Sequence, residues 1–323
     1  MSVIVFVETD NGTVKKSSQE AVFYASELAK KQNTVAVAVA LGAANESSLT
    51  ALGNFGIAKV LHVANDRLNT PSLMAYASAI AAVANTSGAN TIILAKSSLV
   101  DGIASRLAIK LKAAVVTNVV ELPNLTNGFS VKRAIYTGKA FANVSMNAQH
   151  KVLVIKKNAV TLIESSATAA VEKMEISLDD KDFSVVQKEV QKATGEVLLP
   201  EAEIVVSGGR GLKGPENWGI ITDLAKVLGA ATGCSKPVSD MDWRPHHEHV
   251  GQTGVKVSPN LYIAVGISGA IQHLAGVNAS KVIVVINKDP EAPFFKAADY
   301  GIVGDAFEVL PKLTAAFAKV LNS

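Results

Sequence analysis

Residues 261–276 read LYIAVGISGAIQHLAG, and this segment determines the architecture of the second half of the chain. Residues 261–265 form a short apolar run, which is the composition of a buried strand. Small residues dominate positions 266–269, and a helical pattern opens at Ala270. Glycine lets a backbone approach a ligand closely, and the N-terminus of a helix offers free N–H groups to a phosphate. These residues alone leave two interpretations open: a phosphate-binding turn, or an ordinary strand–turn–helix with an exposed His273.

Four flanking segments place this turn in a longer pattern. Residues 205–212 read VVSGGRGL and residues 250–254 read VGQTG, while residues 285–293 read VINKDPEAP and residues 298–303 read ADYGIV. This succession closely resembles the FAD-binding half of electron transfer flavoprotein alpha subunits. The layout of the first half and residues 133–140, RAIYTGKA, resemble the same family more weakly.

The composition limits the class of protein. A length of 323 residues suggests two domains, and 49% hydrophobic with 18% charged residues supplies enough apolar material for packed cores. The formal net charge of +3 is small and the basic residues are scattered, so no nucleic acid partner is expected. The single cysteine, Cys234, fits a reducing compartment. No apolar run reaches membrane-spanning length and no secretory pattern follows Met1, so we expect a cytoplasmic protein without membrane insertion.

The first half alternates strand and helix patterns up to Lys112. At this spacing the alternation predicts a parallel sheet with helices on both faces. The apolar runs that predict strands are residues 3–7, 34–40, 59–63 and 90–95. The patterns that predict helices run from Ser17 or Ser18 to Lys31 and over residues 46–54, 71–86 and 102–112.

From Ala114 the long helical patterns disappear. The apolar runs follow one another directly, so we expect an added antiparallel portion that closes the first domain. These runs are residues 115–122, 129–136, 140–146 and 151–155. Residues 172–200 are richer in charge, although residues 173–177 and 183–190 keep a strand pattern. We place the boundary there, with an N-terminal domain over residues 1–200 and a second domain over residues 201–323.

The second domain also alternates strands and helices. Gly209, Gly211 and Gly214 satisfy a G-x-G-x-x-G pattern between a predicted strand and a predicted helix. The acidic residue that binds the ribose in NAD-binding folds is missing, because residues 232–236 read TGCSK. The other predicted elements are strands at residues 203–207 and 281–286 and helices at residues 215–228 and 308–321. The predicted fold class is α/β with two domains: a parallel-sheet domain with added antiparallel strands, and a Rossmann-like FAD-binding domain.

The resemblance assigns a cofactor role to three residues on two loops. Arg210 lies between glycines, where a planar guanidinium suits the bidentate, charge-assisted hydrogen bonds of a pyrophosphate. Ser235 and Lys236 stand where the family usually has Ser-Arg beside the flavin ring. Lysine keeps the positive charge but loses the planar group that stacks on an aromatic face. We therefore expect Lys236 to act through its charge.

The resemblance also supplies the other residues expected to bind FAD. His273 matches a histidine near the N1/C2-carbonyl edge of the flavin, where a hydrogen-bond donor stabilises the negative charge that collects on reduction. The hydroxyl of Thr253 can donate to or accept from a ring nitrogen. Asn287 and Asp305 match residues at the adenosine end. The whole expected set is Arg210, Ser235, Lys236, Gln252, Thr253, Gly254, Ser268, Gly269, Ala270, Ile271, Gln272, His273, Asn287, Asp305 and Ala306, the last of which departs from the family.

Three further features are expected to be structural. Residues 246–249, HHEH, contain metal-ligand types but no second cluster at zinc spacing, so we expect a solvated loop and no metal site. Cys234 precedes Ser235 and Lys236, and we expect a packed small residue there rather than a reactive thiol. Residues 179–182, DDKD, are expected to be a solvated linker.

The resemblance implies an electron carrier with one FAD in its second domain. It implies a heterodimer with a beta subunit, which carries AMP or a second flavin in this family. Electrons would pass from dehydrogenases, such as acyl-CoA dehydrogenases, to a membrane quinone reductase. No substrate is transformed on the chain itself, so no catalytic residue is expected. The alternatives left open are an electron-bifurcating subunit, a flavin-dependent dehydrogenase with its own small-molecule substrate, and a redox-inactive nucleotide-binding scaffold.

Overall fold

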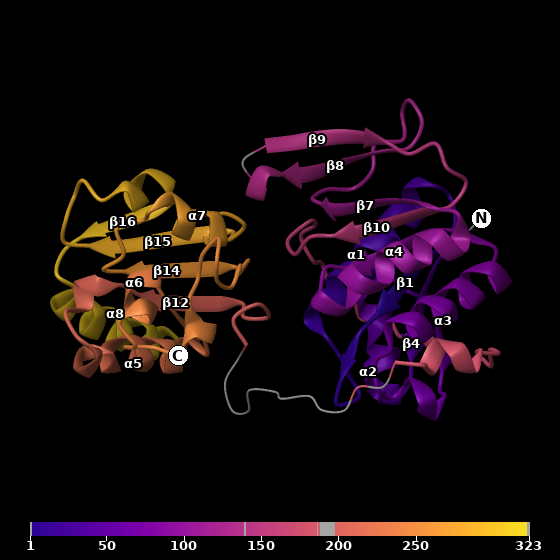
Figure 1. Ribbon diagram of the computed structural model, residues 1–323, viewed down its shortest axis with the longest axis horizontal. Coiled ribbons are helices and arrows are strands. Elements are labelled where there is room, and N and C mark those ends of the chain that lie inside the picture. Colours follow the sequence, from indigo (N-terminus) through magenta and orange to yellow (C-terminus); the bar gives the residue numbers. More distant parts are fainter. Residues whose placement is uncertain (1, 139, 186, 188–197, 322–323) are drawn as a thin grey trace. The chain divides into compact units, whose positions relative to one another are not determined.

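Figure 1 shows the computed structural model of the chain, which describes residues 2–138, 140–185, 187 and 198–321. The chain divides into two compact units, Met1–Val190 and Gln191–Ser323. The domain boundary expected near Pro200 stays a prediction, because residues 188–197 lie outside the described residues. Lys139 and part of the predicted strand at residues 183–190 also lie outside them.

The described part of the first unit is built on a nine-stranded sheet with the order β11-β5-β4-β1-β6-β10-β7-β8-β9 (Figure 1). The strands from β11 to β7 are parallel, and β8 and β9 continue the sheet in antiparallel pairing. The strands are β1 Ser2–Val7, β4 Ala36–Leu41, β5 Lys59–Val63, β6 Ala89–Ala95, β7 Ala114–Val119, β8 Ser130–Ile135, β9 Ala140–Ser145, β10 Lys151–Ile155 and β11 Ala170–Lys173. A small separate hairpin joins β2 Thr9–Asp10 to β3 Thr13–Val14.

The antiparallel portion is smaller than the sequence predicts. β10 pairs in parallel on both sides and β7 is parallel to β10, so β8 and β9 alone among the four predicted strands have only antiparallel pairing. β10 pairs with β6 on one side and β7 on the other, and four of its five residues are buried. An apolar run buried on both faces belongs in the interior of a parallel sheet. The predicted strand at residues 173–177 is also wrong beyond Lys173, where β11 ends.

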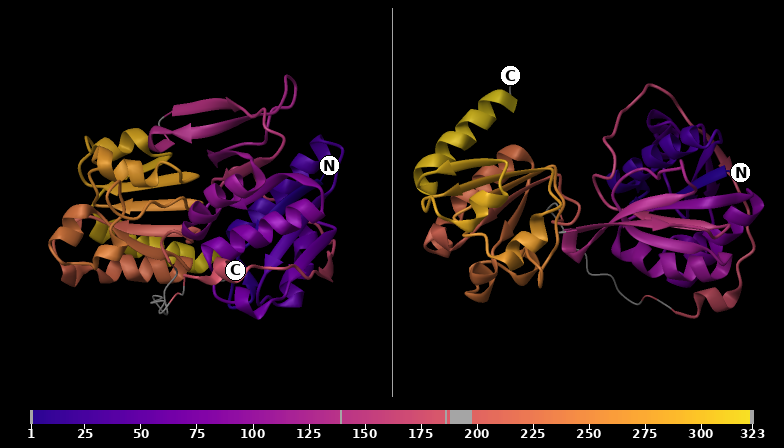
Figure 2. Two further views of the ribbon diagram at one scale, coloured as in Figure 1. Left: turned by 45° about the vertical axis from the view of Figure 1, so that its right-hand side comes forward. Right: turned by 90° about the horizontal axis from the view of Figure 1, so that it is seen from above.

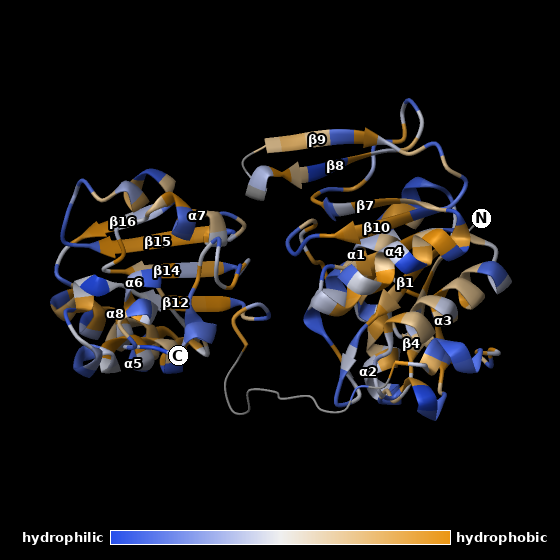
Figure 3. Ribbon diagram, viewed as in Figure 1, coloured by the Kyte–Doolittle hydropathy of each residue, from blue (hydrophilic) through white to orange (hydrophobic). Residues whose placement is uncertain are grey.

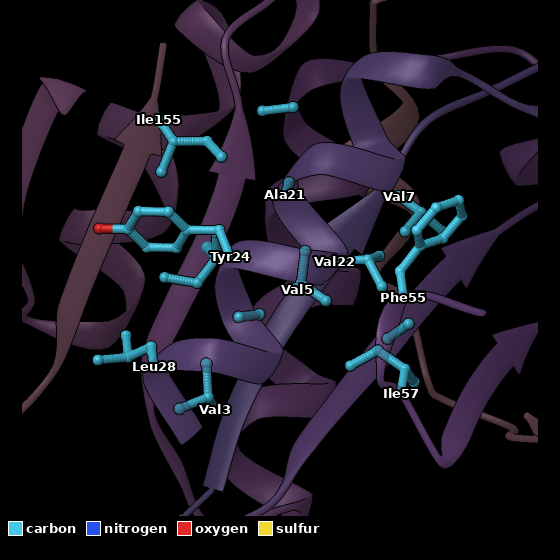
Figure 4. Packing of buried hydrophobic residues seen from close by; sticks show 14 of the residues in the cluster. Val3, Val5, Val7, Ala21, Val22, Tyr24, Leu28, Phe55, Ile57 and Ile155 are labelled. Carbon is cyan, nitrogen blue, oxygen red and sulfur yellow. The ribbon is translucent and has the colours of Figure 1, made fainter. Parts of the chain in front are cut away.

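Helices cover both faces of this sheet (Figure 2). Val3 and Val5 of β1 face the core under α1, while Ile4 and Phe6 face the core under α3 and α4. Figure 4 shows Tyr24 of α1 among the residues of the first core. The alternation along β1 therefore supplies two cores, as the period of a strand requires. The helices are α1 Lys16–Lys31, α2 Glu46–Thr50, α3 Leu73–Thr86 and α4 Ser98–Leu111.

Two helices of the first unit differ from the prediction at their ends. α4 begins at Ser98 and not at Gly102, because the Oγ of Ser97 accepts the backbone N–H of Val100 at 3.1 Å and caps the helix. The helix predicted over residues 46–54 is split, since α2 ends at Thr50 and a 3₁₀ turn follows over Ala51–Phe55.

The second unit contains a five-stranded parallel sheet with the order β13-β12-β14-β15-β16 in its described residues. The strands are β12 Ile204–Gly208, β13 Ala231–Cys234, β14 Leu261–Val265, β15 Val282–Asn287 and β16 Tyr300–Val303. The helices are α5 Gly219–Leu228, α6 Lys236–Asp240, α7 Ile271–Val277 and α8 Ala306–Leu321. The strand predicted at residues 261–265 is confirmed at both ends.

The two faces of this sheet are covered by different elements. Val206 and Ile263 pack against α5 and α8, whereas Val205 and Tyr262 pack against α7 and the segment around Val250. The apolar composition of β15 is visible in Figure 3, as expected for a strand covered on both faces. None of the helices in the described residues combines the length and the hydropathy that a membrane span requires.

Candidate functional site

The loops that leave the five parallel strands of the second unit start from one edge of the sheet. In open α/β sheets, ligands bind at the carboxyl ends of the strands, where the strand order changes direction. Here β13 follows β12 on one side and β14 lies on its other side, so the change occurs between β12 and β14. Most of the predicted FAD-binding residues follow directly after these strands.

The loops after β12 and β14 meet through their backbones. The N–H of Gly209 donates to the carbonyl of Val265 at 2.8 Å, and the N–H of Gly211 donates to the carbonyl of Gly266 at 3.1 Å. A Cβ atom on Gly209 would clash with the carbonyl oxygen of Gly266. Gly266 itself has a φ of +61°, in the left-handed region. Glycine at these positions therefore keeps two backbones in direct contact at the switch point.

Arg210 lies between these glycines with its side chain exposed. Within the described residues its guanidinium takes part in no hydrogen bond or ion pair. Ser235 is buried after β13, and its N–H donates to the carbonyl of Gly208 at 3.0 Å. Lys236, the first residue of α6, is exposed. The edge thus carries two accessible positive charges on neighbouring loops.

The loop after β14 is braced from β15 and from the segment after it. The Nδ2 of Asn287 donates to the carbonyl of Ile267 at 3.0 Å, and the N–H of Phe294 donates to the carbonyl of Ser268 at 3.0 Å. Gly269 has a φ of +85°, and a Cβ atom there would lie 2.5 Å from the Cβ of Phe294. The side chain of Asn287 therefore holds the loop in place. The exposed residues of this loop and of the first turn of α7 are Ser268, Ala270, Ile271 and Gln272.

The segment with Gln252, Thr253 and Gly254 lies against the start of α7. The N–H of Gln252 donates to the carbonyl of Gln272 at 2.7 Å. A Cβ atom on Gly276 would lie 2.6 Å from the Cα of Gly251, so the helix and the segment pack backbone to backbone. The side chains of Gln252 and Thr253 remain exposed.

Asp305 and Ala306 follow β16 at the start of α8. The Oδ1 of Asp305 accepts the N–H of Phe307 at 3.0 Å, and its carbonyl accepts the N–H groups of Glu308 and Val309. Asp305 is therefore the N-cap of α8. Ala306 is buried, so it contributes no exposed side chain to the edge.

His273 is buried in the first turn of α7, and only 6% of it is exposed. Its Nε2 lies 2.9 Å from the Oη of Tyr262, and its ring contacts the ring of Phe294 edge-on at 5.6 Å. Burial lowers the pKa of His273 to about 4, and His249 nearby adds to the decrease. The ring is therefore neutral at pH 7. The simpler interpretation of this turn, which expected His273 to be exposed, is therefore wrong.

Four buried side-chain polar atoms of this unit have no hydrogen-bond partner of normal geometry among the described residues: Ser207 Oγ, Trp218 Nε1, His249 Nδ1 and His273 Nδ1. Unsatisfied buried polar atoms are rare in folded proteins, and each requires an explanation such as a bound molecule or a functional role. Together with the glycine contacts and the two exposed cations, they suit an anionic dinucleotide at the carboxyl edge.

Two expectations about solvated segments are wrong for part of each segment, while residues 246–247 and 179–181 are exposed as expected. Glu248 and His249 are buried, and Glu248 forms an ion pair with Arg244, whose Nε donates to Oε2 at 2.9 Å. Asp182 of the 179–182 segment is also buried, with Lys110 at 3.9 Å. In both segments a buried carboxylate has a basic side chain nearby: Arg244 for Glu248 and Lys110 for Asp182. Buried charges are normally paired in this way.

Two further features concern metal and thiol chemistry. The described residues contain no group of three or more histidine, cysteine or acidic side chains that could hold a metal ion. Cys234 is buried, and burial raises the pKa of its thiol to about 12, so the thiolate that reacts or binds metal does not form near pH 7. Cys234 is confirmed as a packed residue.

Sequence reasoning missed Tyr262, His249 and Phe294 as parts of this site. Tyr262 lies inside a run that reads as a buried strand, and the one available signal was its hydroxyl, which requires a partner when buried. His249 lies beside the glycine segment because Val255 donates to its carbonyl at 2.7 Å. No spacing rule in the sequence predicts that contact.

The five-stranded parallel sheet, its glycine loops and its exposed cations define a nucleotide-binding α/β domain. The family model described as the electron transfer flavoprotein FAD-binding domain matches residues 198–278, and the electron transfer flavoprotein domain matches residues 3–179. The chain belongs to the family of electron transfer flavoprotein alpha subunits, and its second unit contains the FAD-binding domain.

Curated relatives match over almost the whole chain. The electron transfer flavoprotein subunit alpha of Bacillus subtilis is 37% identical over 322 residues, which cover 99% of this chain and 98% of the relative. The corresponding subunit of Paracoccus denitrificans is 39% identical over 97% of this chain and 99% of its own length. That of Syntrophomonas wolfei is 36% identical over 98% of both chains.

Proposed function

We propose that this chain is the FAD-carrying subunit of a heterodimeric electron carrier in the cytoplasm. Its partner is a beta subunit. The pair accepts electrons from dehydrogenases such as acyl-CoA dehydrogenases and passes them to a membrane quinone reductase. The observation that carries the proposal is the backbone contact between the glycines after β12 and β14, which creates a close approach for a dinucleotide in a chain of this family.

The residues of this chain bind and orient the cofactor. Arg210 has an exposed guanidinium without a protein partner in the described residues, so we assign it to the pyrophosphate. Lys236, Thr253 and His273 are assigned to the flavin end. Asp305 uses Oδ1 to cap α8, and we assign its other oxygen to a ribose hydroxyl. When bound, FAD supplies reversible electron transfer, and no general base or nucleophile of this chain is required.

The proposal is tested by co-expressing the chain with its beta subunit and counting FAD per heterodimer. We expect one FAD in this chain, and we expect its reduction by an acyl-CoA only when an acyl-CoA dehydrogenase is present. Direct reduction by a small-molecule substrate would instead indicate a dehydrogenase. Transfer of the two electrons of NADH to two different acceptors would indicate the bifurcating type, and absence of flavin would indicate a scaffold.

The cofactor assignment has its own variant. Arg210→Ala should weaken FAD binding about 10- to 100-fold, because a hydrogen bond to a charged group is worth about 1.5–3 kcal/mol. Lys226→Ala removes an exposed cation from the last turn of α5, away from the carboxyl ends of the strands, and serves as the matched control. Equal FAD retention in the two variants after dialysis would contradict the role of Arg210.

A further inference from the structure

The hydrogen bond between Tyr262 and His273 connects the sheet to the first turn of α7 across the loop at residues 266–270. The two side chains are 0% and 6% exposed, and 2.9 Å separates the tyrosine Oη from the imidazole Nε2. We propose that Tyr262 is a positioning residue: its hydroxyl donates to Nε2 of His273 and fixes the imidazole as the neutral tautomer with its hydrogen on Nδ1.

The states of the two groups allow the tyrosine hydroxyl to donate to the imidazole. Burial raises the pKa of Tyr262 far above its usual range, so the phenol keeps its hydrogen and can donate. Burial lowers the pKa of His273 to about 4, so the ring is neutral near pH 7. A neutral imidazole that accepts at one nitrogen carries its hydrogen on the other. A hydrogen bond with the backbone of Val250 also favours the protonated form of the imidazole.

The hydroxyl of Tyr262 is the side-chain group within hydrogen-bond distance of Nε2, and the backbone of Val250 also interacts with the ring. The ring of Phe294 lies 5.6 Å from the imidazole at an interplanar angle of 73° and 6.4 Å from the ring of Tyr262. Nδ1 of His273 has no hydrogen-bond partner of normal geometry among the described residues. Turning the ring over would exchange its polar and apolar edges and break the bond at Nε2, so Tyr262 selects both the orientation and the tautomer.

The functional meaning of this contact rests on the proposed FAD site. A histidine held in this way presents a neutral ring in one orientation at the loop after β14, and it contributes no positive charge near pH 7. Tyr262 is then responsible for the state of His273, although Tyr262 belongs to the core of the sheet.

The tautomer can be measured directly by NMR. The FAD-loaded heterodimer is prepared with ¹⁵N-histidine in this chain, which has six histidines, and long-range ¹H–¹⁵N spectra report the tautomer of each ring. His273→Gln assigns the signal by its loss. We expect the wild-type ring to carry its hydrogen on Nδ1. In Tyr262→Phe the ratio of the Nδ1–H to the Nε2–H form should fall about fivefold, which corresponds to one hydrogen bond of about 1 kcal/mol.

Tyr76→Phe is the matched control. It removes another buried phenol hydroxyl, which donates to the carbonyl of Leu68 at 2.7 Å in the first unit. It should affect stability in a similar way and leave the His273 signal unchanged, which separates positioning from a general structural effect.

Two results would overturn the proposal: an Nε2–H tautomer in the wild-type protein, or an unchanged tautomer ratio in Tyr262→Phe. If Tyr262→Phe does not fold, the tautomer of His273 in the wild-type spectrum alone tests the proposal. The flavin content of the same samples is counted separately. A protein without FAD whose His273 carries its hydrogen on Nδ1 would support the positioning role and contradict the proposed function.

Discussion

At the scale of single residues, His273 links the stability of the protein to pH. Its pKa is about 4 in the folded chain against an ordinary value of 6.5. Below pH 6.5 the unfolded state binds more protons than the folded state, so the free energy of unfolding decreases as the pH falls toward 4. Between pH 7 and pH 5 this histidine should cost the wild-type protein about 2 kcal/mol.

Urea unfolding of wild type and His273→Gln at pH 7 and pH 5 measures this cost. Between pH 7 and pH 5 the free energy of unfolding of the variant should fall by about 2 kcal/mol less than that of wild type, since the variant lacks the titrating group. His247→Gln replaces an exposed histidine and serves as the matched control. Parallel pH profiles for wild type and His273→Gln would mean that the pKa of His273 in the folded protein is not lowered from its ordinary value.

Lys236 is the second residue whose effect can be predicted. It is exposed, so at the flavin end proposed for it its charge would act through solvent and be worth about 0.5–1 kcal/mol. Lys236→Ala should therefore lower the first one-electron potential by about 20–45 mV, because 59 mV corresponds to about 1.4 kcal/mol for one electron. Lys236→Arg should keep the native potential if charge alone matters. Spectroelectrochemical titration compares the three proteins, and a native potential in the alanine variant would exclude Lys236 as a charge partner.

At the scale of elements, the contact between the β12 and β14 loops depends on Gly209. Its Cβ in Gly209→Ala would clash with the carbonyl of Gly266, which is backbone and cannot move aside. We expect a loss of about 1–3 kcal/mol in stability, as for other overpacked sites, together with weaker FAD binding. Thermal unfolding and retained FAD measure both effects.

Gly219→Ala is the control for this substitution. Gly219 begins α5, and a Cβ atom there meets nothing within 4 Å. The alanine should be neutral or stabilise the helix by about 0.5–1 kcal/mol. If both alanine variants kept full FAD and stability, the loops after β12 and β14 would not depend on their backbone contact.

The elements with strong periodicity could be predicted from the sequence, and the short or exposed ones could not. β1 and β14 are apolar runs, so local patterns suffice. β13 is four residues long with an internal glycine, and β16 is exposed at every residue, so neither has an apolar period. The parallel direction of β10 depends on its pairing with β6 and β7, which are distant in the sequence.

The same distinction applies to the candidate site. Parallel strands end at one edge, so a sequence that predicts the strands also predicts which loops meet there. The states of individual side chains depend on tertiary contacts. Asn287 and Asp305 use side-chain atoms to brace a loop and to cap a helix, and Glu248 is buried against Arg244. Asp305 followed three residues later by Glu308 is a helix-start signal, but the sequence positions of Asn287 and Glu248 contain no sign of their contacts.

At the scale of the whole molecule, the last strand of each sheet carries exposed apolar side chains. β16 is the last strand of the second sheet, and Tyr300 and Val303 on it are 67% and 60% exposed. β9 is the last strand of the first sheet, where Phe141 is 56% exposed. Edge strands with exposed apolar side chains promote association unless another surface covers them.

We therefore expect the chain to require its beta subunit for a defined state in solution. Expressed alone, it should be polydisperse in light scattering and hold less than one FAD per chain, because obligate interfaces are large and apolar and their exposed surfaces self-associate. Co-expression should give a monodisperse heterodimer with a full FAD content. Size-exclusion chromatography with light scattering and flavin absorbance measures both quantities on each preparation. A lone chain that is monomeric, monodisperse and loaded with FAD would contradict this dependence, since the exposed edges would then be tolerated without a partner.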